Sequence, residues 1–236
     1  MLQYLTMRHA PPRPAKPAGR QLQAVMFDMD GLLVDSEPLW FEVETEVMAR
    51  LGGAWGEADQ RALLGGSLAR TVAYLLARAA RPASAQDVAR WLVDGMTALL
   101  AARGPRVLPG AAELLAEVRA AGVAHALVTS SERPIMEAVL SRPGLSFEVT
   151  VCAGDVRRGK PDPEPYLRAA TLLGADPRNC VALEDSPNGV AAAEAAGCKL
   201  VAVPSLVPIL ETPGRTVAAS LSDVDLGMLH ALAAAG

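Results

Sequence analysis

The chain has 236 residues, of which 51% are hydrophobic and 20% are charged, and its formal net charge is −4. These values are typical of a soluble globular protein with enough chain for one large domain or two modest ones. The acidic balance argues against a nucleic-acid partner, because binding to a nucleic-acid backbone requires a basic surface.

The first segment with a structural signal follows a stretch without one. Residues 1–20 are rich in proline and basic side chains, and we expect them to be a disordered leader. Residues 22–28, LQAVMFD, have the apolar character of a strand that is buried on both faces. The carboxylates in the next stretch, residues 28–37, are Asp28, Asp30, Asp35 and Glu37. Like charges this close repel one another, so either the loop is solvated or a positive group lies among them.

The following region, residues 38–106, shows helical spacing without a strand signal. We therefore predict an all-helical insert directly after the acidic stretch. The two ends of an insert lie close together, so this one should cover the carboxyl end of the first strand as a lid. Pro109 and Gly110 mark the return to alternating strands and helices.

After the insert, short apolar runs alternate with helical patterns. The runs that predict strands are residues 124–129, 147–152, 180–184 and 199–204. The patterns that predict helices are residues 111–122, 132–140, 164–174 and 187–197. Such alternation indicates right-handed βαβ units and a parallel sheet that is covered on both faces.

These patterns together predict an α/β fold, with a Rossmann-like parallel-sheet core and an inserted all-helical cap. We expect the core to comprise residues 21–37 and 107–236, and the cap to comprise residues 38–106. Within the core, residues 206–236 should add a final helix against the sheet.

The cysteines and the apolar runs indicate where the protein acts. Cys152, Cys180 and Cys198 each lie in or beside an apolar run. Their odd number favours reduced, buried thiols in a cytoplasmic protein over disulfides or a zinc site. No apolar run approaches the roughly 20 residues of a membrane-spanning helix, so we expect no membrane partner.

The polar residues at the predicted strand ends indicate the chemistry, because ligands of open α/β sheets bind beyond the carboxyl ends of the strands. The residues at these ends and in the adjoining loops are Asp28, Asp30, Thr129, Ser130, Ser131, Lys160, Glu184 and Asp185. Several carboxylates in one crevice require a divalent cation such as Mg²⁺, which prefers oxygen ligands. A lysine, a hydroxyl and loop amides beside it predict a phosphoryl-binding site. The sequence lacks a P-loop and a strand-end GxGxxG, which argues against a nucleotide or dinucleotide site.

Four segments carry a resemblance to a known family. DMDGLLVDSEPLW, VTSSE, GKPDPEPY and ALEDSPNGV resemble, in this order, the four motifs of the haloacid dehalogenase superfamily. Within it, residues 22–205 are similar to the branch of sugar-phosphate phosphatases and β-phosphoglucomutases that carry a helical cap. The first segment is most similar to phosphatases of hexose, deoxyhexose or hexitol phosphates. The resemblance therefore implies hydrolysis of a small-molecule phosphate ester with Mg²⁺ as cofactor.

The resemblance implies roles for the aspartates of the first motif. Asp28 would be the nucleophile that attacks phosphorus and forms an aspartyl-phosphate. Asp30 would protonate the leaving alcohol and then deprotonate the water that hydrolyses the intermediate. Its carboxyl must change protonation state and stay free of the metal, and in the family its backbone carbonyl is the ligand instead. Asp35 and Glu37 would belong to the hinge toward the cap.

The resemblance also implies a metal site and a phosphate-binding site. The implied metal-binding residues are Asp28, Asp30, Glu184 and Asp185. Among these, Glu184 would orient a metal-bound water. Thr129 and the amide of Ser130 would hold the phosphoryl oxygens, and Lys160 would neutralise charge on the nucleophile and on the phosphate.

The nearest alternative is a phosphomutase, which uses the same nucleophile but returns the phosphoryl group to the sugar. β-Phosphoglucomutases carry an arginine and a histidine where this chain has Leu68 and Trp40, and both departures weaken that interpretation. Arg70 lies two residues further along, where its side chain would point elsewhere. A dehalogenase is disfavoured by Asp30, and a non-catalytic regulator that binds a phosphorylated metabolite is the alternative from another class. The expected protein is a cytoplasmic sugar- or polyol-phosphate phosphatase, as a monomer or weak homo-oligomer.

Overall fold

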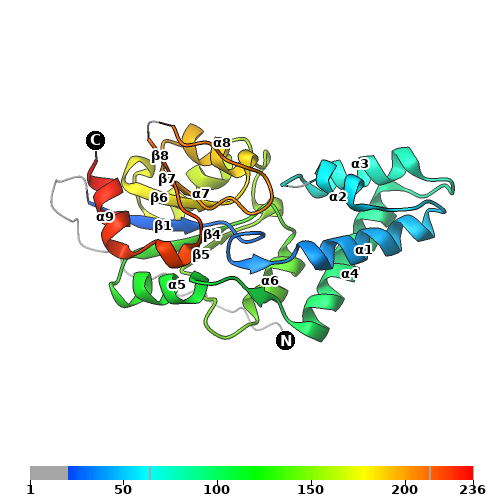
Figure 1. Cartoon of the computed structure of the whole chain (residues 1–236), viewed down its shortest axis with the longest axis horizontal. Helices are drawn as coiled ribbons and strands as arrows, with labels where there is room; N and C mark the ends of the chain where they lie inside the picture. Colours follow the sequence, from blue (N-terminus) through cyan, green and yellow to red (C-terminus); the bar gives the residue numbers. More distant parts are fainter. Residues whose placement is uncertain (1–20, 64, 213, 236) are drawn as a thin grey trace, which may run out of the picture.

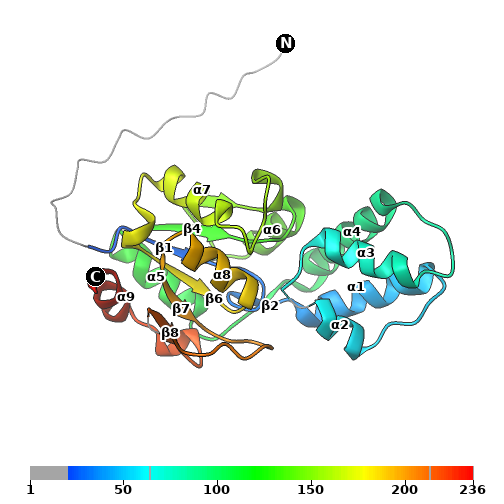
Figure 2. The ribbon, with the colours of Figure 1, turned by 90° about the horizontal axis from the view of Figure 1, so that it is seen from above.

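The computed structural model describes residues 21–63, 65–212 and 214–235, so the expected leader, residues 1–20, lies outside the described residues. Two bodies stand side by side in it, an α/β core and a bundle of four helices (Figure 1). A view from above shows the same division, with the bundle reached from the core through the strand β2 (Figure 2). We refer to the bundle as the cap.

A six-stranded sheet forms the centre of the core. Its strands are β1 (Ala24–Phe27), β4 (Ala124–Val128), β5 (Val149–Val151), β6 (Cys180–Glu184), β7 (Lys199–Ala202) and β8 (Arg215–Val217). They lie in the order β5-β4-β1-β6-β7-β8, and every neighbouring pair is parallel, which confirms the predicted α/β class. Phe27 is in register with Leu127 on one side and with Leu183 on the other. The central strands therefore end level with one another, and the residues that follow them meet at one edge.

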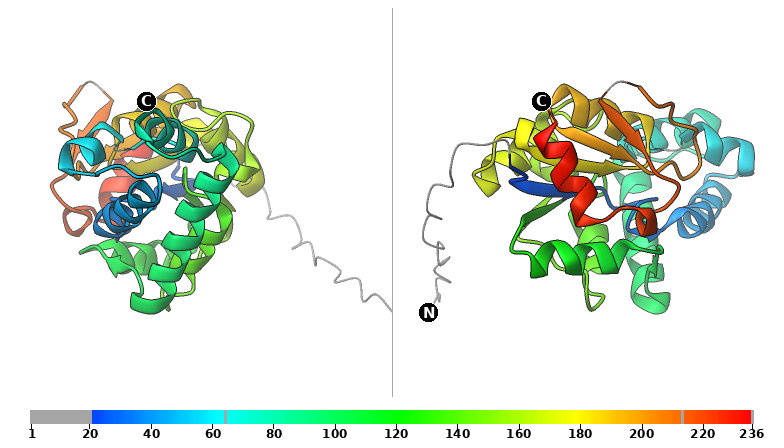
Figure 3. Two further views of the ribbon diagram at one scale, coloured as in Figure 1. Left: turned by 90° about the vertical axis from the view of Figure 1, so that its right-hand side faces the viewer. Right: turned by 60° about the vertical axis from the view of Figure 1, so that its left-hand side comes forward.

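Helices cover both faces of the sheet, as the continuous apolar strands require. The core helices are α5 (Ala111–Ala120), α6 (Arg133–Leu140), α7 (Glu164–Leu173), α8 (Pro187–Ala195) and α9 (Leu226–Ala234). Alternate side chains of β1 point to opposite faces: Val25 and Phe27 pack with α5, α6 and α9, whereas Met26 packs with α7 and α8. The predicted final helix is α9, which lies against β6 and α5 (Figure 3). Short 3₁₀ helices occupy Ala153–Asp155, Pro177–Asn179 and Leu221–Asp223.

The described residues of the cap form helices joined by loops. The helices are α1 (Glu37–Arg50), α2 (Glu57–Leu63), α3 (Leu68–Arg78) and α4 (Ala85–Arg103). Side-chain oxygens of Ser67 and Ser84 accept the backbone N–H groups of the first turns of α3 and α4, so both helices begin at a capping serine. α4 packs against α1 and α3 within the cap and against α6 of the core.

Two short strands connect the cap with the core, and no sequence pattern predicted them. β2 (Val34–Asp35) pairs antiparallel with β3 (Arg106–Val107), so the chain enters and leaves the cap side by side. An ion pair of 3.0 Å between Asp35 and Arg106 joins the same strands. Two residues are too few for periodicity to register. The edge strand β8, which is partly exposed and lies in no continuous apolar run, was not expected either. The insert predicted at residues 38–106 thus contains one residue of β3, and its first helix begins at Glu37.

The remaining sequence expectations concern the cysteines and the membrane. All three cysteines are buried and none forms a disulfide. In the described part of the chain, no helix combines the length and the apolar character needed to cross a membrane.

Gly110 fixes the start of α5 against the 3₁₀ turn Leu221–Asp223, which yields a testable prediction. Its φ is +81°, and an added Cβ would lie 2.2 Å from the backbone nitrogen of Ser222. Gly110→Ala should therefore lower the free energy of unfolding by at least about 2 kcal/mol in urea denaturation. Gly174→Ala is the matched control, because its φ is +65° but no atom lies within 4 Å, and it should cost about 1 kcal/mol. Equal losses in the two variants would contradict the close contact.

Candidate active site

Lys160 lies at the centre of the site. Its ammonium Nζ donates to Asp28 Oδ1 at 2.5 Å, to Glu184 Oε1 at 2.6 Å and to the carbonyl of Val128 at 2.8 Å. These acceptors belong to or follow three adjacent strands, and they use all three ammonium hydrogens. Burial lowers the pKa of Lys160, but the charges of Asp28 and Glu184 outweigh burial and raise it above its ordinary value. Lys160 is therefore a buried cation, held in place at the carboxyl ends of the three strands.

Asp28 directly follows β1, and its backbone N–H donates to the carbonyl of Leu183 at 3.0 Å. This hydrogen bond to β6 fixes the main chain at Asp28, so the position of the Asp28 carboxyl is fixed as well. Burial raises the pKa of Asp28 well above its ordinary value, Lys160 lowers it, and the neighbouring carboxylates Glu184 and Asp185 raise it. The structure therefore brings Asp28 and Lys160 together, as the sequence predicted for the nucleophile and the lysine.

Glu184 is fully buried at the end of β6. Its Oε1 accepts the Tyr166 hydroxyl at 2.5 Å in addition to the Lys160 ammonium. Gly189, in α8, leaves the necessary space, since a Cβ there would lie 1.9 Å from the Glu184 carboxyl. Glu184 is therefore held between a helix and a tyrosine, and its strongest contact is with the lysine.

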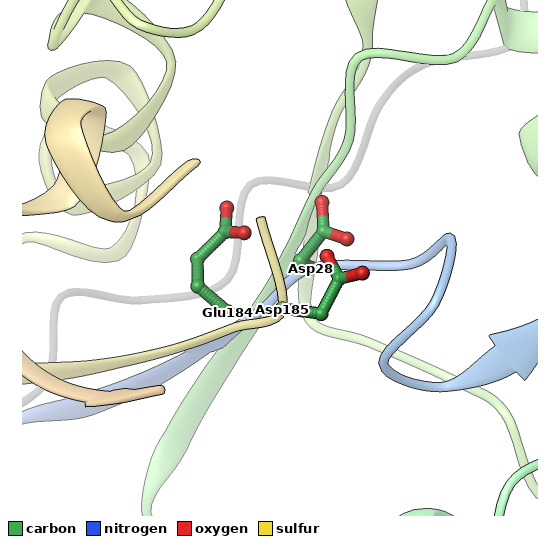
Figure 4. Close-up of side chains that lie close together, drawn as sticks. All are labelled: Asp28, Glu184 and Asp185. Atoms are coloured by element: carbon green, nitrogen blue, oxygen red, sulfur yellow. The ribbon is translucent and has the colours of Figure 1, made fainter. Parts of the chain in front are cut away.

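Three carboxylates converge at this edge of the sheet and could hold a metal ion. One oxygen from each of Asp28, Glu184 and Asp185 lies within 4.8 Å of the others. The close-up shows these three side chains close together (Figure 4). Burial, followed by the charge of Glu184, raises the pKa of Asp185 to about 7. One ammonium cannot balance three buried carboxylates, and their oxygens are the ligands that hard divalent cations prefer. The donor set and its charge deficit therefore fit such a cation.

Asp30 has different surroundings from Asp28. Its Oδ1 accepts the Ser36 hydroxyl at 2.6 Å, and its Oδ2 accepts the hydroxyls of Ser131 at 2.7 Å and Thr129 at 3.4 Å. The carboxyl lies outside the cluster of three carboxylates, so its side chain is free of the candidate metal site. This agrees with the expectation of an acid–base group that does not ligate the metal through its side chain.

Gly31 allows the main chain after Asp30 to approach the carboxyl of Asp185 closely. The φ of Gly31 is +84°, and a Cβ on it would lie 2.1 Å from Asp185 Oδ2. That oxygen instead accepts the Ser205 hydroxyl at 2.5 Å. A side chain at position 31 would displace the carboxyl that completes the acidic cluster.

The remaining predicted residues lie beside these groups. Thr129 Oγ1 accepts the backbone N–H of Ser131 at 3.0 Å, which fixes the turn after β4. Ser130 lines the same cavity as Asp28 and Lys160. Asp35 lies in β2 and pairs with Arg106, away from the acidic cluster.

Sequence reasoning assigned no role to four residues that hold the site together. Ser36 and Ser131 bind Asp30, Tyr166 binds Glu184, and Ser205 binds Asp185. Ser36, Ser131 and Tyr166 stand within the motif-like segments, but the sequence does not show which carboxylate each of them binds. Ser205 stands in no such segment, and only the folded chain brings it to Asp185.

A cavity of about 110 Å³ lies over these groups, between core and cap. Its cap-side lining residues are Glu37, Trp40, Glu44, Gln60, Leu63, Gly65, Gly66, Leu68 and Thr71. Lys160 is the one cationic side chain among the described residues that line it. Arg70 is exposed and donates to the carbonyl of Ala62 at 2.7 Å, so its guanidinium points elsewhere, as expected. Asn188 Nδ2, from α8, donates to the carbonyl of Gly65 at 2.8 Å and joins the cap loop to the core.

Comparisons with known proteins agree with this geometry. Residues 22–197 match the haloacid dehalogenase-like hydrolase family. Hexitol phosphatase B of Escherichia coli (strain K12) is 37% identical over 219 residues, which are 91% of this chain and 96% of that protein. The crystal structure of CbbY from Rhodobacter sphaeroides in complex with phosphate has a TM-score of 0.81 and 30% identity, covering 88% of this chain and 99% of that one. A putative β-phosphoglucomutase from Thermotoga maritima has a TM-score of 0.67 and 29% identity, covering 89% and 98%.

The charge deficit of the acidic cluster predicts binding of a divalent cation. Titrating chelator-treated protein with MgCl₂ should raise its unfolding temperature by about 5 °C at about 100 times the dissociation constant. Asp185→Asn should lose more than half of this rise, because it removes the negative charge of one of the three converging ligands. Asp94→Asn, an exposed substitution on α4, should keep the full rise. An equal rise in wild type and Asp185→Asn would contradict the assignment.

Proposed function

The chain belongs to the haloacid dehalogenase-like hydrolases, and on that premise we propose that it is a Mg²⁺-dependent phosphatase of a small sugar or polyol phosphate. One observation carries the proposal: two carboxyls two residues apart have opposite environments. Asp28 is buried and bound to Lys160, whereas Asp30 is held by hydroxyl groups outside the acidic cluster. A nucleophile and a proton-transfer group need this difference.

The mechanism assigns nucleophilic attack to Asp28 and proton transfer to Asp30. Asp28 attacks phosphorus, and a bond forms between its oxygen and phosphorus as the bond from phosphorus to the ester oxygen breaks. Asp30 gives its proton to that departing oxygen, which leaves as an alcohol. Asp30, now a carboxylate, removes a proton from water, and the resulting hydroxide attacks phosphorus. Phosphate departs and Asp28 is restored.

The other residues hold these groups and the phosphoryl oxygens. Lys160 favours the ionised form of Asp28 against the effect of burial and orients its carboxyl, while Glu184 keeps Lys160 in place. Thr129 and the amide of Ser130 lie at the cavity side of β4, where they can donate to phosphoryl oxygens. Mg²⁺ held by the carboxylates of Asp28 and Asp185 supplies positive charge that offsets the charge of the phosphoryl group.

The size of the cavity and the relatives support a small substrate. The cavity, of about 110 Å³, is lined on one side by the core and on the other by the cap. The cap covers it, so a macromolecular ester has no access without displacement of the cap. We propose that the cap opens for binding and release and excludes bulk water when closed. The similarity to hexitol phosphatase B supports a sugar or polyol phosphate as the substrate class.

The phosphomutase alternative requires a second cationic site. A mutase must hold the bisphosphate intermediate by its other phosphate while the sugar reorients. Lys160 is the one cation along the described lining of the cavity, and it is fully bonded within the core. Leu68 and Trp40 line the cap side, and the guanidinium of Arg70 points away. These residues favour phosphatase over mutase, although a putative mutase shares the fold.

We also propose that the protein acts in the cytoplasm, as a monomer or weak homo-oligomer and without a nucleic-acid partner. Three free, buried cysteines suit a reducing compartment. The net charge of −4 supports the absence of nucleic-acid binding.

The nucleophile assignment predicts the behaviour of Asp28→Asn. The amide is a poor nucleophile, so hydrolysis of p-nitrophenyl phosphate with Mg²⁺ should fall at least about 10³-fold. Asp94→Asn, the same substitution at an exposed position, should keep the wild-type rate. Unchanged activity of Asp28→Asn would overturn the assignment.

A product analysis separates the phosphatase from the mutase. Incubation with β-glucose 1-phosphate and a trace of β-glucose 1,6-bisphosphate should release free phosphate, measured colorimetrically, faster than glucose 6-phosphate forms. Glucose 6-phosphate is followed by coupling to its dehydrogenase. Isomerisation that outpaces phosphate release would instead establish a mutase.

A further inference from the structure

Helix α1 presents one face to the cavity. Glu37, Trp40 and Glu44 follow the spacing i, i+3, i+7, and all three line the cavity. Glu37 lies near Asp30, and burial, followed by the charge of Asp30, raises the pKa of Glu37 to about 7. Glu44 lies two turns further into the cap, about 10 Å along the helix axis. The face therefore runs from the reacting groups toward the far end of a bound substrate.

Glu44 is a buried carboxyl whose hydrogen bonding is incomplete. The residue is 5% exposed, and its Oε2 is buried and forms no hydrogen bond within the described residues. Burial raises the pKa of Glu44 to about 8, the charge of Glu37 adds to this rise, and the nearby indole N–H of Trp55 opposes it. The indole nitrogen of Trp55 is itself buried and falls outside the geometry of a hydrogen bond. Buried carboxyls are normally well hydrogen-bonded, so Glu44 retains the capacity to accept a hydrogen bond from a ligand in the cavity.

The neighbours of Glu44 do not supply that ligand. Gln60 Nε2 donates to Glu37, at 3.2 Å to its Oε2 and at 2.9 Å to its carbonyl, so Gln60 holds Glu37. Thr71, the other buried polar side chain here, is neutral. The cap side of the cavity thus offers two carboxyls, an amide and a hydroxyl, with no cation among its described residues.

We propose that Glu44 is a specificity-determining residue that accepts a hydrogen bond from a hydroxyl at the non-phosphorylated end of the substrate. The enzyme then selects phosphate esters whose far end is neutral and bears hydroxyls. It rejects esters whose far end is a carboxylate or a second phosphate, because such an end would be desolvated beside two acidic groups without a cation. The inference rests on the proposed phosphatase function and names the substrate class within it.

Two esters that differ only at the far end test the proposal. Sorbitol 6-phosphate ends in a hydroxymethyl group, and 6-phosphogluconate ends in a carboxylate at the same carbon. At pH 8.5, above the pKa of about 8 of Glu44, wild type should have a kcat/KM at least about tenfold higher for sorbitol 6-phosphate. In Glu44→Gln this ratio should fall at least about fivefold, because the variant removes the charge but keeps the shape.

Three controls make the test specific. Glu46→Gln, an exposed substitution on the same helix, should keep both kcat/KM values within about twofold. Calorimetric titration of both esters into Asp28→Asn, with and without Glu44→Gln, should show the same change in selectivity as dissociation constants, without turnover. The unfolding temperature of Glu44→Gln should equal or exceed that of wild type, because an unpaired buried carboxyl is removed.

The outcomes distinguish failure of the role proposed for Glu44 from failure of the proposed phosphatase function. Hydrolysis of acetyl phosphate, which has no extended far end, tests the phosphatase itself, and failure of wild type there defeats both proposals. If wild type hydrolyses acetyl phosphate but prefers sorbitol 6-phosphate over 6-phosphogluconate by less than about threefold in kcat/KM, the role of Glu44 is overturned and the phosphatase function stands. An unchanged ratio in Glu44→Gln, or a tenfold preference for glucosamine 6-phosphate over glucose 6-phosphate, also overturns the role of Glu44. If Glu44→Gln does not fold, the ratio of the two kcat/KM values of wild type, sorbitol 6-phosphate over 6-phosphogluconate, tests the proposal by itself.

Discussion

A single buried ammonium organises the functional end of this protein. The three hydrogens of Lys160 bind acceptors from three adjacent strands, and these acceptors meet only because β4, β1 and β6 end in register. Removing any one acceptor would leave charge unpaired in a buried place, at a cost of several kcal/mol. The arrangement still carries an excess of carboxylates. The chain thus folds with a deficit of positive charge at the place where a cation and a phosphoryl group are proposed to bind.

The same constraint explains how two neighbouring aspartates acquire different chemistry. Asp28 is held by the main chain of β6 and by Lys160, whereas the turn at Gly31 carries Asp30 into a group of hydroxyls. Hydroxyl donors can bind either protonation state of a carboxyl, because each can rotate. An ammonium favours only the ionised state. Environment, and not residue type, thereby separates an ion-paired carboxyl from one suited to exchange protons.

The parts that sequence could predict are those that depend on topology. Parallel strands deliver the residues after them to one edge, so the order of strands and helices along the chain was enough to group Asp28, Lys160 and Asp185. Tyr166 and Ser205 could not be given their roles, because their partners depend on the directions of side chains from distant elements. The role of Glu44 could not be predicted either, because in a sequence with helical spacing it resembles any polar residue on the exposed face of a helix. The strands β2 and β3 were missed because two residues show no periodicity.

Ser36, which precedes α1, connects the cap with the proposed acid–base group Asp30. Ser36 belongs to the entrance of the cap, yet its hydroxyl holds one oxygen of Asp30, the proposed proton carrier. Because both chain passages run through the paired strands β2 and β3, the proposed opening of the cap would turn α1 about the position of Ser36. Opening the cavity would then loosen the Asp30 carboxyl, and closing it would orient the carboxyl again. The position of the cap would thereby couple access of substrate to the cavity with the orientation of the group that transfers protons.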